Sequence, residues 1–353
     1  MNRFLQLHLL TFYPPANLNR DDTGRPKSAV VGGAPRLRVS SQALKRAWRT
    51  SAVFGTALAG HMGSRTQRLG EQIEAHLIAS GSAPEAATRI AREIIPVFGK
   101  PKPEKDPAPT RTEQLAFISP EERAAAMDLA DRLAAGEKIK VEADAILRHT
   151  DTAADIAMFG RMLADNANFN REAAVQVAHA ITTHKVTVED DYYTAVDDLK
   201  TSAEDAGAGF VGEAAFGSGV FYLYVCIDRA LLLRNLGGDS DLAGIATAAL
   251  VEAAATVSPR GKQNSFAAFG RAHYLLAEAA DDQPRTLAGA FANPVEGGGL
   301  MKPSITALLD FRRKLDSAYG LTATASAAMD VIEGTGTLAE ILGFVRGLGA
   351  ADA

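Results

Sequence analysis

Seven polar and basic side chains near the N-terminus are of the types that bind phosphate oxygens. They are Arg20, Lys27, Ser40, Gln42, Lys45, Arg46 and Arg49. The first two lie in a segment rich in glycine and proline, and the others lie at or after the start of a predicted helix. A helix start offers free N–H groups and a positive dipole, hydroxyl and amide groups add hydrogen bonds, and cationic side chains neutralise charge. Since none of these groups must read a base edge, the stretch predicts binding to a nucleic-acid backbone regardless of sequence.

The distribution of charge along the chain supports this interpretation. Residues 1–50 carry nine basic and two acidic side chains, whereas all 353 residues have 37 basic and 42 acidic ones, a net charge of −5. Positive charge is therefore concentrated in one segment of an otherwise acidic protein, which is typical of a local anion-binding surface. The alternative is a basic face that is only solvated.

Motifs for catalysis or metal binding are weak. The sequence contains no CxxC, HExxH or GxxxxGK[ST] motif. His179 and His184 point to opposite faces of a predicted strand, so we expect core or turn roles for them. The adjacent carboxylates Asp21 and Asp22 suit a turn. We therefore expect neither a catalytic site nor a cofactor or metal, and we place Trp48 in the core because it shares a helix face with Leu44.

The elements that must position these side chains follow from periodicity. Alternating apolar and polar residues predict four strands, at about residues 4–10, 175–183, 218–227 and 271–278. Helices are expected from residue 41, after a capping box at Ser119, over 240–257 and within 303–349. Residues 13–37 are interpreted as a loop because glycine and proline interrupt them. The order β-α-β-β-α-β predicts an α+β fold with an RRM-like (ferredoxin-like) sheet.

Two segments interrupt this predicted sheet. Residues 56–170 are rich in alanine and charge and predict an inserted helical subdomain. Residues 186–217 are acidic and then glycine-rich, which indicates a mobile hairpin or flap. The single cysteine, Cys226, and the lack of a signal segment or a long apolar run predict a cytoplasmic protein that does not enter a membrane.

Two blocks of sequence carry a family resemblance. The first is Leu18-Asn19-Arg20-Asp21-Asp22 with Arg38-Val39-Ser40-Ser41-Gln42-Ala43-Leu44-Lys45-Arg46, and the second contains Ala178-His179-Ala180-Ile181-Thr182-Thr183-His184 and Ser218-Gly219-Val220-Phe221-Tyr222. Together they resemble the CasC family, the backbone subunit of the type I-E CRISPR surveillance complex called Cascade, an antiviral ribonucleoprotein. The resemblance implies a palm (residues 1–55 and 171–353) with a thumb hairpin at about 186–217, and helical fingers (residues 56–170).

The same resemblance implies partners and site residues. Copies of such a protein polymerise on one CRISPR guide RNA (crRNA), together with other Cascade subunits, and the guide pairs with target DNA. The positions that match ones facing the RNA backbone are Arg20, Ser40, Gln42, Lys45, Arg46 and Arg49. Lys27 matches a basic position in the preceding loop, and Arg161 is also expected to bind RNA. Family members have further methionines after Arg161-Met162 that help to wedge the RNA. This chain lacks them, and Phe169 is the nearest apolar candidate.

The implied function is that of a non-catalytic RNA-binding scaffold. An alternative is a metal-dependent RNA-cleaving backbone subunit, because related type III complexes cleave target RNA with an aspartate in the loop after the first strand. Asp21 and Asp22 occupy such a loop.

Overall fold

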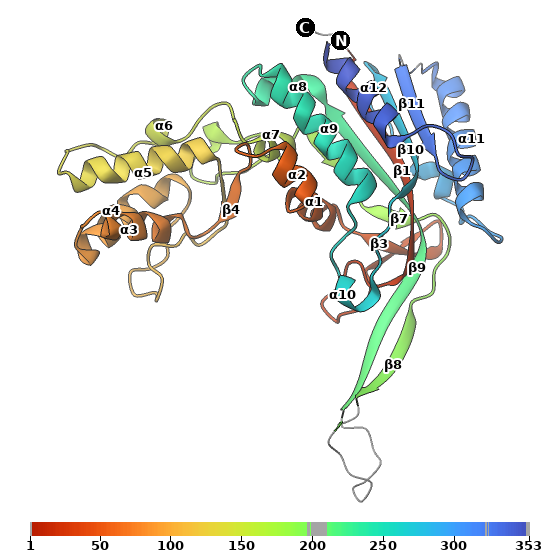
Figure 1. Ribbon diagram of the computed structural model, residues 1–353, viewed down its shortest axis with the longest axis horizontal. Coiled ribbons are helices and arrows are strands. Elements are labelled where there is room, and N and C mark those ends of the chain that lie inside the picture. The colour runs from red at the N-terminus through yellow and green to blue at the C-terminus, as the bar shows by residue number, and fades with distance from the viewer. Residues whose placement is uncertain (1, 196–197, 199–209, 322, 324, 351–353) are drawn as a thin grey trace, which may run out of the picture. The chain divides into compact units, whose positions relative to one another are not determined.

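The computed structural model describes residues 2–195, 198, 210–321, 323 and 325–350. The chain divides into two compact units (Figure 1). The first unit takes the described residues of 1–53, 177–226 and 250–352, and the second takes those of 54–176 and 227–249. No helix in the described ranges is long and apolar enough to span a bilayer.

A large antiparallel sheet organises the first unit. Its strands run in the order β11-β10-β1-β9-β7-β3-β2, and β6 and β8 also pair with β9. Their bounds are β1 Phe4–Ala16, β2 Ser28–Val31, β3 Ala34–Val39, β6 Val175–Val177, β7 Ala180–Thr182, β8 Glu189–Ala195, β9 Phe210–Asp228, β10 Ala272–Ala280 and β11 Ala325–Asp330. The helical segments that lie wholly in this unit are α1 Ser41–Arg49, α10 Gln263–Phe266, η3 Ala288–Phe291, α11 Met301–Tyr319 and α12 Leu338–Ala350. The bounds of the two units fall within α2 Ala52–Ala57 and α9 Ser240–Thr256.

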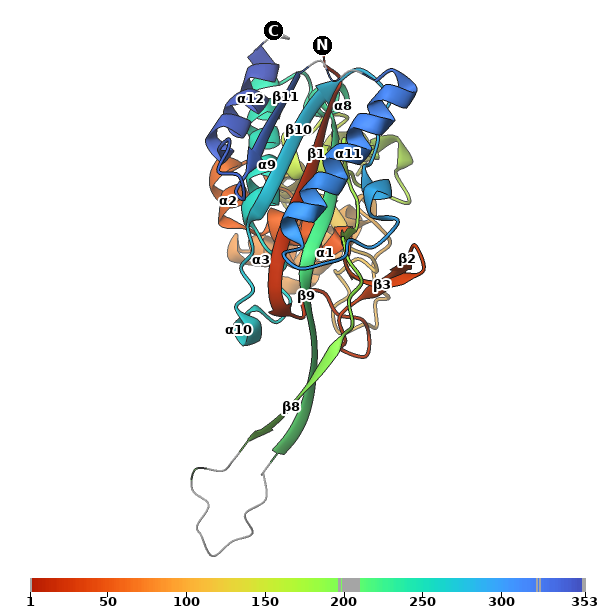
Figure 2. The same ribbon diagram turned by 90° about the vertical axis from the view of Figure 1, so that its right-hand side faces the viewer.

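Strand β1 is buried on both faces. Leu5, Leu7 and Leu9 are fully buried, and so are Gln6 and His8 on the opposite face. An alternation of apolar and polar residues, which predicted this strand, is typical of a strand with only one buried face. Helix α11 covers that face, as Figure 2 shows, and its apolar side chains pack with those of β1, β9 and β10. The buried polar residues of β1 therefore hydrogen-bond within the protein.

The predicted loop at residues 13–37 is wrong over much of its length. β1 continues to Ala16, and β2 and β3 form a hairpin in which Val31 pairs with Ala34. Gly32 and Gly33 make the two-residue turn with φ of 58° and 76°. Two consecutive positive φ angles match the twist of neighbouring strands and are the geometry that glycine adopts without strain. The closely spaced glycines and prolines thus conceal two short strands.

A strand lies between two helices in the C-terminal part, where the sequence predicted only helices. β11 pairs antiparallel with β10, from Tyr274 opposite Asp330 to Ala279 opposite Ala325. Short strands rich in alanine lack the β-branched residues that predict strands. β11 therefore forms because it pairs with β10 in the folded protein, and not because its own residues favour a strand.

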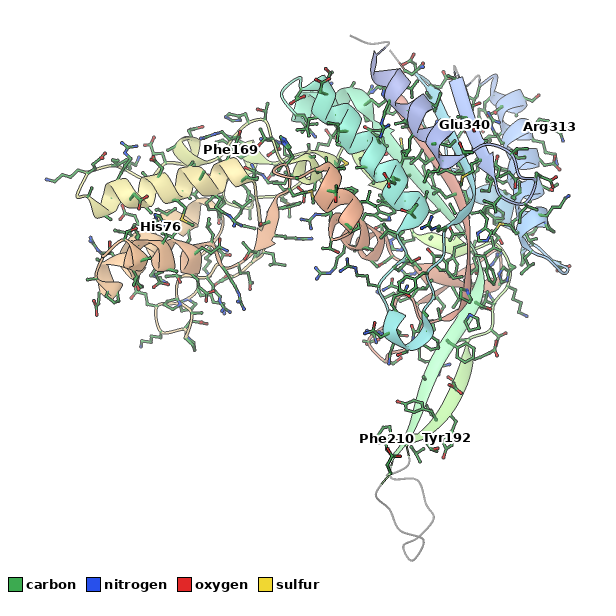
Figure 3. All side chains as sticks on the ribbon, viewed as in Figure 1. His76, Phe169, Tyr192, Phe210, Arg313 and Glu340 are labelled. Atoms are coloured by element: carbon green, nitrogen blue, oxygen red, sulfur yellow. The ribbon has the colours of Figure 1, made fainter. Side chains whose placement is uncertain are left out.

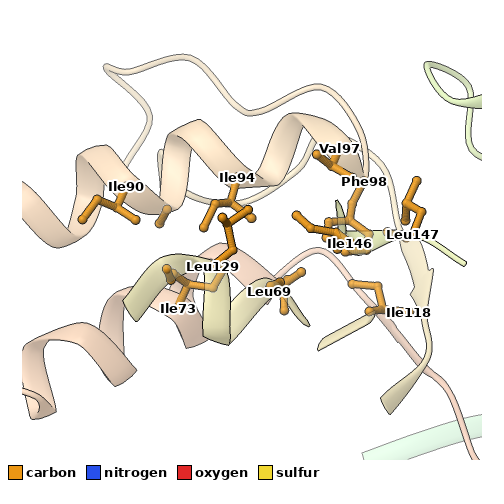
Figure 4. Close-up of a cluster of buried hydrophobic side chains, with 14 of the residues drawn as sticks. Leu69, Ile73, Ile90, Ile94, Val97, Phe98, Ile118, Leu129, Ile146 and Leu147 are labelled. Carbon is orange, nitrogen blue, oxygen red and sulfur yellow. The ribbon is translucent and has the colours of Figure 1, made fainter. Parts of the chain in front are cut away.

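The second unit is a helical body with its own core. Its elements are β4 Ser64–Thr66, α3 Leu69–Ala79, α4 Pro84–Ile94, η1 Ile95–Val97, β5 Ala116–Ile118, α5 Pro120–Ala134, α6 Ala143–Ile146, α7 Ala154–Phe159, η2 Ala167–Phe169 and α8 Arg229–Asn235. Ile73, Ile94 and Leu129 from three helices meet in the cluster that Figure 4 draws. The capping box is confirmed: Ser119 Oγ accepts from Glu122 N, and Glu122 Oε2 accepts from Ser119 N, both at 3.1 Å.

Strand β8 and the first residues of β9 form a hairpin (Figures 1 and 2). Glu189 pairs with Phe216 and Ala195 with Phe210, and every residue of β8 is exposed. The segment that joins the two strands, which belongs to the predicted flap, lies outside the described residues except for residue 198.

Candidate nucleic-acid interface

The start of α1 is built by side chains from two segments. Ser40 is the N-cap, and its Oγ accepts a hydrogen bond from Ala43 N at 3.3 Å. Asn19 Oδ1 in turn accepts from Ser40 N at 2.8 Å, so the loop after β1 holds the cap in place. The Ser40 hydroxyl, expected at the RNA, is thus already used to cap the helix.

Helix α1 separates an apolar face from a polar one. Leu44, Ala47 and Trp48 are buried, and the predicted core position of Trp48 is confirmed because its side chain is 0% exposed. On the polar face Gln42 and Arg46 are exposed, whereas Lys45 and Arg49 are partly buried. Partial burial lowers the pKa of Lys45, because desolvation disfavours the charged ammonium.

Three arginines from distant segments line one cavity beside α1. The cavity has a volume of about 390 Å³, and Arg20, Arg46 and Arg260 contribute to its wall with Asp21. Neither Arg20 nor Arg46 forms a side-chain hydrogen bond or ion pair with any residue that the structure describes. The guanidinium of Arg260 donates to Thr50 O at the C-terminal end of α1. Guanidinium groups that no carboxylate neutralises in an ion pair suit an anionic ligand.

Residues of the segment that follows α9 were missed by the sequence analysis. Arg260 lines the first cavity, and Lys262 lines a second one of about 340 Å³ that also involves Arg20, Arg25 and Asp190. Between them Gly261 passes so close to the loop after β1 that a Cβ would lie 2.2 Å from Leu18 O. The signal available in the sequence was a basic pair around a glycine, Arg260-Gly261-Lys262.

Asp21 has a structural role in the turn that precedes β2. Its Oδ1 accepts hydrogen bonds from Thr23 N at 2.9 Å, Thr23 Oγ1 at 2.8 Å and Arg25 N at 3.0 Å. The bond from the Thr23 hydroxyl lowers the pKa of Asp21, and the backbone bonds add to the effect. In the described ranges no group of three or more His, Cys, Asp and Glu side chains could hold a metal ion. Asp21, one of the two aspartates that the RNA-cleavage alternative names, is therefore held in a turn, whereas Asp22 is exposed.

Arg161 lies in the interior of the second unit. Its guanidinium donates to both oxygens of Glu122, at 2.5 and 2.7 Å, and its Nε donates to Phe169 O at 3.2 Å. The two side chains are 1% and 0% exposed. Burial alone would raise the pKa of Glu122, and the hydrogen bonds and charge of Arg161 lower it. The expectation that Arg161 faces a ligand is corrected, because this guanidinium neutralises a buried carboxylate.

Phe169, labelled in Figure 3, is also buried. It is 5% exposed, and its ring stacks on that of His149 at 4.6 Å between centroids. It belongs to the core cluster of the second unit. The expected wedge role of Phe169 is therefore corrected, since its ring is packed inside. Met162 is 81% exposed and is the accessible apolar side chain directly after Arg161.

The structure thus brings together part of the predicted set. Arg20 and Arg46 share one cavity, and Ser40 and Gln42 lie at the start of α1. Lys27 lies at the other end of the same loop, where its N donates to Asn19 O at 2.8 Å. Arg161 and Phe169 belong to the second unit.

Comparison with solved structures finds chains of CRISPR surveillance complexes among its matches. A chain described as "CRISPR RNA-guided surveillance complex, pre-nicking" is 29% identical, with a TM-score of 0.85, and the match covers 99% of both chains. A chain described as "CRISPR RNA-guided surveillance complex" is 25% identical, with a TM-score of 0.63, over 99% of this chain and 100% of that one. The comparison with curated proteins found no match.

The family follows from a model of CT1975-like proteins, which matches residues 5–341. The protein belongs to this family. The resemblance to a subunit of CRISPR surveillance complexes that the sequence indicated is confirmed.

Proposed function

We propose that this protein is an RNA-binding scaffold subunit of a CRISPR RNA-guided surveillance complex, the backbone subunit of a type I-E Cascade. The single observation that carries the proposal is the cavity at which Arg20, Arg46 and Arg260 meet. The overall similarity to chains of such complexes, over 99% of this chain, supports it.

The cavity suits the phosphates of a single strand. Charge-assisted hydrogen bonds from guanidinium groups to phosphate oxygens are short and strong, and Arg20 and Arg46 have no described partner to give up. Gln42 and the partly buried Lys45 extend the polar face along α1. The residues that line the cavity include no aromatic ring, and the Asn19 amide oxygen already accepts from Ser40 N. We therefore expect the protein to bind guides of different sequence alike.

The finer fold assignment belongs to the same proposal. The central strands β10, β1, β9 and β7 lie in the order 4-1-3-2 when numbered along the chain, as in an RRM-like palm. We assign the first unit as the palm, the second as the fingers and the β8–β9 hairpin as the thumb. The exposed aromatic side chains of that hairpin, Tyr192 and Phe210, support a contact role (Figure 3).

The proposed partners follow from this role. Further copies of the chain, other Cascade subunits and the crRNA form the complex, and target DNA joins by pairing with the guide. The subunit itself is proposed to be non-catalytic, which the turn hydrogen bonds of Asp21 support. Exposed Met162 is the side chain that we assign as the wedge in place of Phe169.

Purification from the native cell tests the proposal. The protein should carry a discrete RNA of guide length together with sister subunits, and a variant with Arg20→Ala and Arg46→Ala should lose that RNA. Arg313→Ala is the matched control, because Arg313 is an exposed arginine of α11 that pairs with Asp310. Recovery of the wild-type protein with no RNA, or with RNA of random length only, would overturn the proposal.

A further inference from the structure

A second cationic cluster lies in the first unit, beside the hairpin of β2 and β3. Lys27 precedes β2, Arg38 belongs to β3, and His179 lies between β6 and β7. Lys27 and Arg38 are cross-strand neighbours, since Arg38 N donates to Lys27 O at 2.8 Å. Arg38 Nη1 lies 2.7 Å from His179 Nδ1. Three chain segments therefore bring three basic side chains to one place.

The contact between Arg38 and His179 defines the protonation of the imidazole. A guanidinium has only donors, so Nδ1 of His179 must accept and the proton must be on Nε2. Desolvation of the ring, and then the charges of Arg38 and Lys27, lower the pKa of His179 below its usual value. His179 is thus a neutral ring held by a neighbouring cation, and its side chain is exposed.

This cluster lacks a counter-charge. In the described ranges no carboxylate forms an ion pair with Lys27, Arg38 or His179. Lys27 and Arg38 lie on paired segments of backbone, and the charges of both act on His179. An anion bound beside them would be attracted by both cations.

We propose that Lys27, Arg38 and His179 form a phosphate site for the RNA backbone, and that binding there is coupled to proton uptake by His179. The inference rests on the proposed function and adds Arg38, His179 and a proton to it. A phosphate oxygen forms a stronger hydrogen bond with the Arg38 guanidinium than a neutral imidazole nitrogen does. When Arg38 turns to the phosphate, Nδ1 loses its donor, takes a proton from solvent and becomes a second donor to the anion.

The sign of the coupling follows from these steps. The free protein holds His179 neutral at neutral pH, with Arg38 on β3 and Lys27 before β2 as the charged groups that face it. A bound phosphate favours the imidazolium and raises its pKa. RNA affinity must therefore increase as pH falls through the window between the free and the bound pKa, and it must level off below the free pKa.

The test measures the affinity for a fluorescent single-stranded RNA by anisotropy, at constant ionic strength, at about pH 7.5 and about pH 6.0. For the wild-type protein we expect affinity to rise about threefold to tenfold between these values, since one pKa unit corresponds to a factor of ten. In His179→Gln this rise should disappear, because glutamine can accept from Arg38 but cannot take a proton. His273→Gln is the matched control, since His273 is a partly buried ring of β10 whose Nδ1 lies 2.9 Å from Arg271 O. It should keep the rise.

NMR of ¹³C-labelled histidine provides the second measurement. The titration of His179, assigned with His179→Gln, should move to higher pH when RNA is added. A titration of His179 that RNA does not move, or a pH dependence that His179→Gln retains, overturns the inference. Wild-type protein that binds RNA equally at both pH values contradicts this inference alone, whereas wild-type protein that binds no RNA at about pH 7.5 contradicts the proposed function itself.

Discussion

Arginines in two regions of this protein have opposite roles. Around α1, Arg20 and Arg46 line an open cavity, and neither pairs with a described carboxylate. In the second unit, Arg161 and Arg171 are buried and paired with Glu122 and Asp151. The difference shows that residue type alone does not identify a phosphate-binding arginine. What decides is whether a carboxylate elsewhere in the chain has already neutralised it.

The largest effect is expected when one member of a buried ion pair is removed. Arg161→Ala leaves the Glu122 carboxylate buried and uncompensated, which costs about 3–5 kcal/mol of unfolding free energy. Urea unfolding of the purified variant measures this loss. Arg313→Ala serves as the control, since its exposed pair with Asp310 should leave the transition midpoint unchanged. A midpoint for Arg161→Ala equal to that of the wild type would mean that the buried pair contributes little.

The next prediction asks whether the same rule applies to a buried carboxylate of the first unit. Glu278 lies 3.2 Å from His8 Nε2 and pairs with Arg285 and Arg312. Burial alone would raise its pKa, and the contact with His8 and the charges of the two arginines lower it to about 2. A carboxyl with a lowered pKa stabilises the fold at pH values above its unfolded-state pKa, and this stabilisation is lost as pH falls to the folded value.

We therefore expect the wild-type protein to lose about 3 kcal/mol of stability from this group between about pH 5 and about pH 2. His8 acts in the same direction, because burial lowers its pKa and acid must protonate it against that burial. Chemical denaturation across this range, for the wild type and for Glu278→Gln, checks the prediction. The two curves should converge at low pH, and parallel curves would contradict it.

The arginines that line the open cavity are tested by RNA binding. Arg20→Ala with Arg46→Ala should weaken binding of single-stranded RNA by about tenfold or more. It should also reduce the slope of log affinity against log salt by about 0.7 for each lost contact. The unfolding midpoint should stay near that of the wild type, because neither guanidinium supports another described group. Anisotropy titrations at several salt concentrations measure both quantities, and an unchanged slope would remove these arginines from the interface.

The smallest effect concerns the cap that positions the cavity. Ser40→Ala removes the hydroxyl that accepts from Ala43 N and should cost about 1 kcal/mol of stability. Ser40→Asp keeps an acceptor at the cap and should restore most of that loss. Thermal unfolding compares the two variants. If the aspartate variant is restored in stability yet weaker in RNA binding, the added negative charge lies beside the phosphate path, as the proposed function requires.

Local signals in the sequence were sufficient for part of the fold. The capping box at Ser119 and the burial of Trp48 were predicted, because both depend on residues within one or two helical turns. The hairpin of β2 and β3 was missed because Gly32 and Gly33 break periodicity whether they end a structure or join two strands. In such cases only the pairing partner distinguishes a turn from a loop.

For the candidate site the limit was sequence distance. Arg20 and Arg46 were predicted from a local cluster of charge, but Arg260 reaches the same cavity from more than 200 positions away. Arg161 was misassigned for a related reason, since the Glu122 that neutralises it lies 39 positions earlier in the chain. A basic residue in a family block does not by itself reveal whether a carboxylate will meet it in the fold.

Strand β9 has a mechanical consequence for the hairpin. It is one continuous strand of 19 residues that pairs with β8 near its start and with β7 further along. The seven residues of β8 span roughly 20 Å at about 3.3 Å each. A rotation of about five degrees at the sheet would thus move the end of the paired strands by more than about one ångström. The paired part of the hairpin is thus continuous with the central strand of the sheet, so a displacement of β8 is passed through β9 to the backbone hydrogen bonds between β7 and β9.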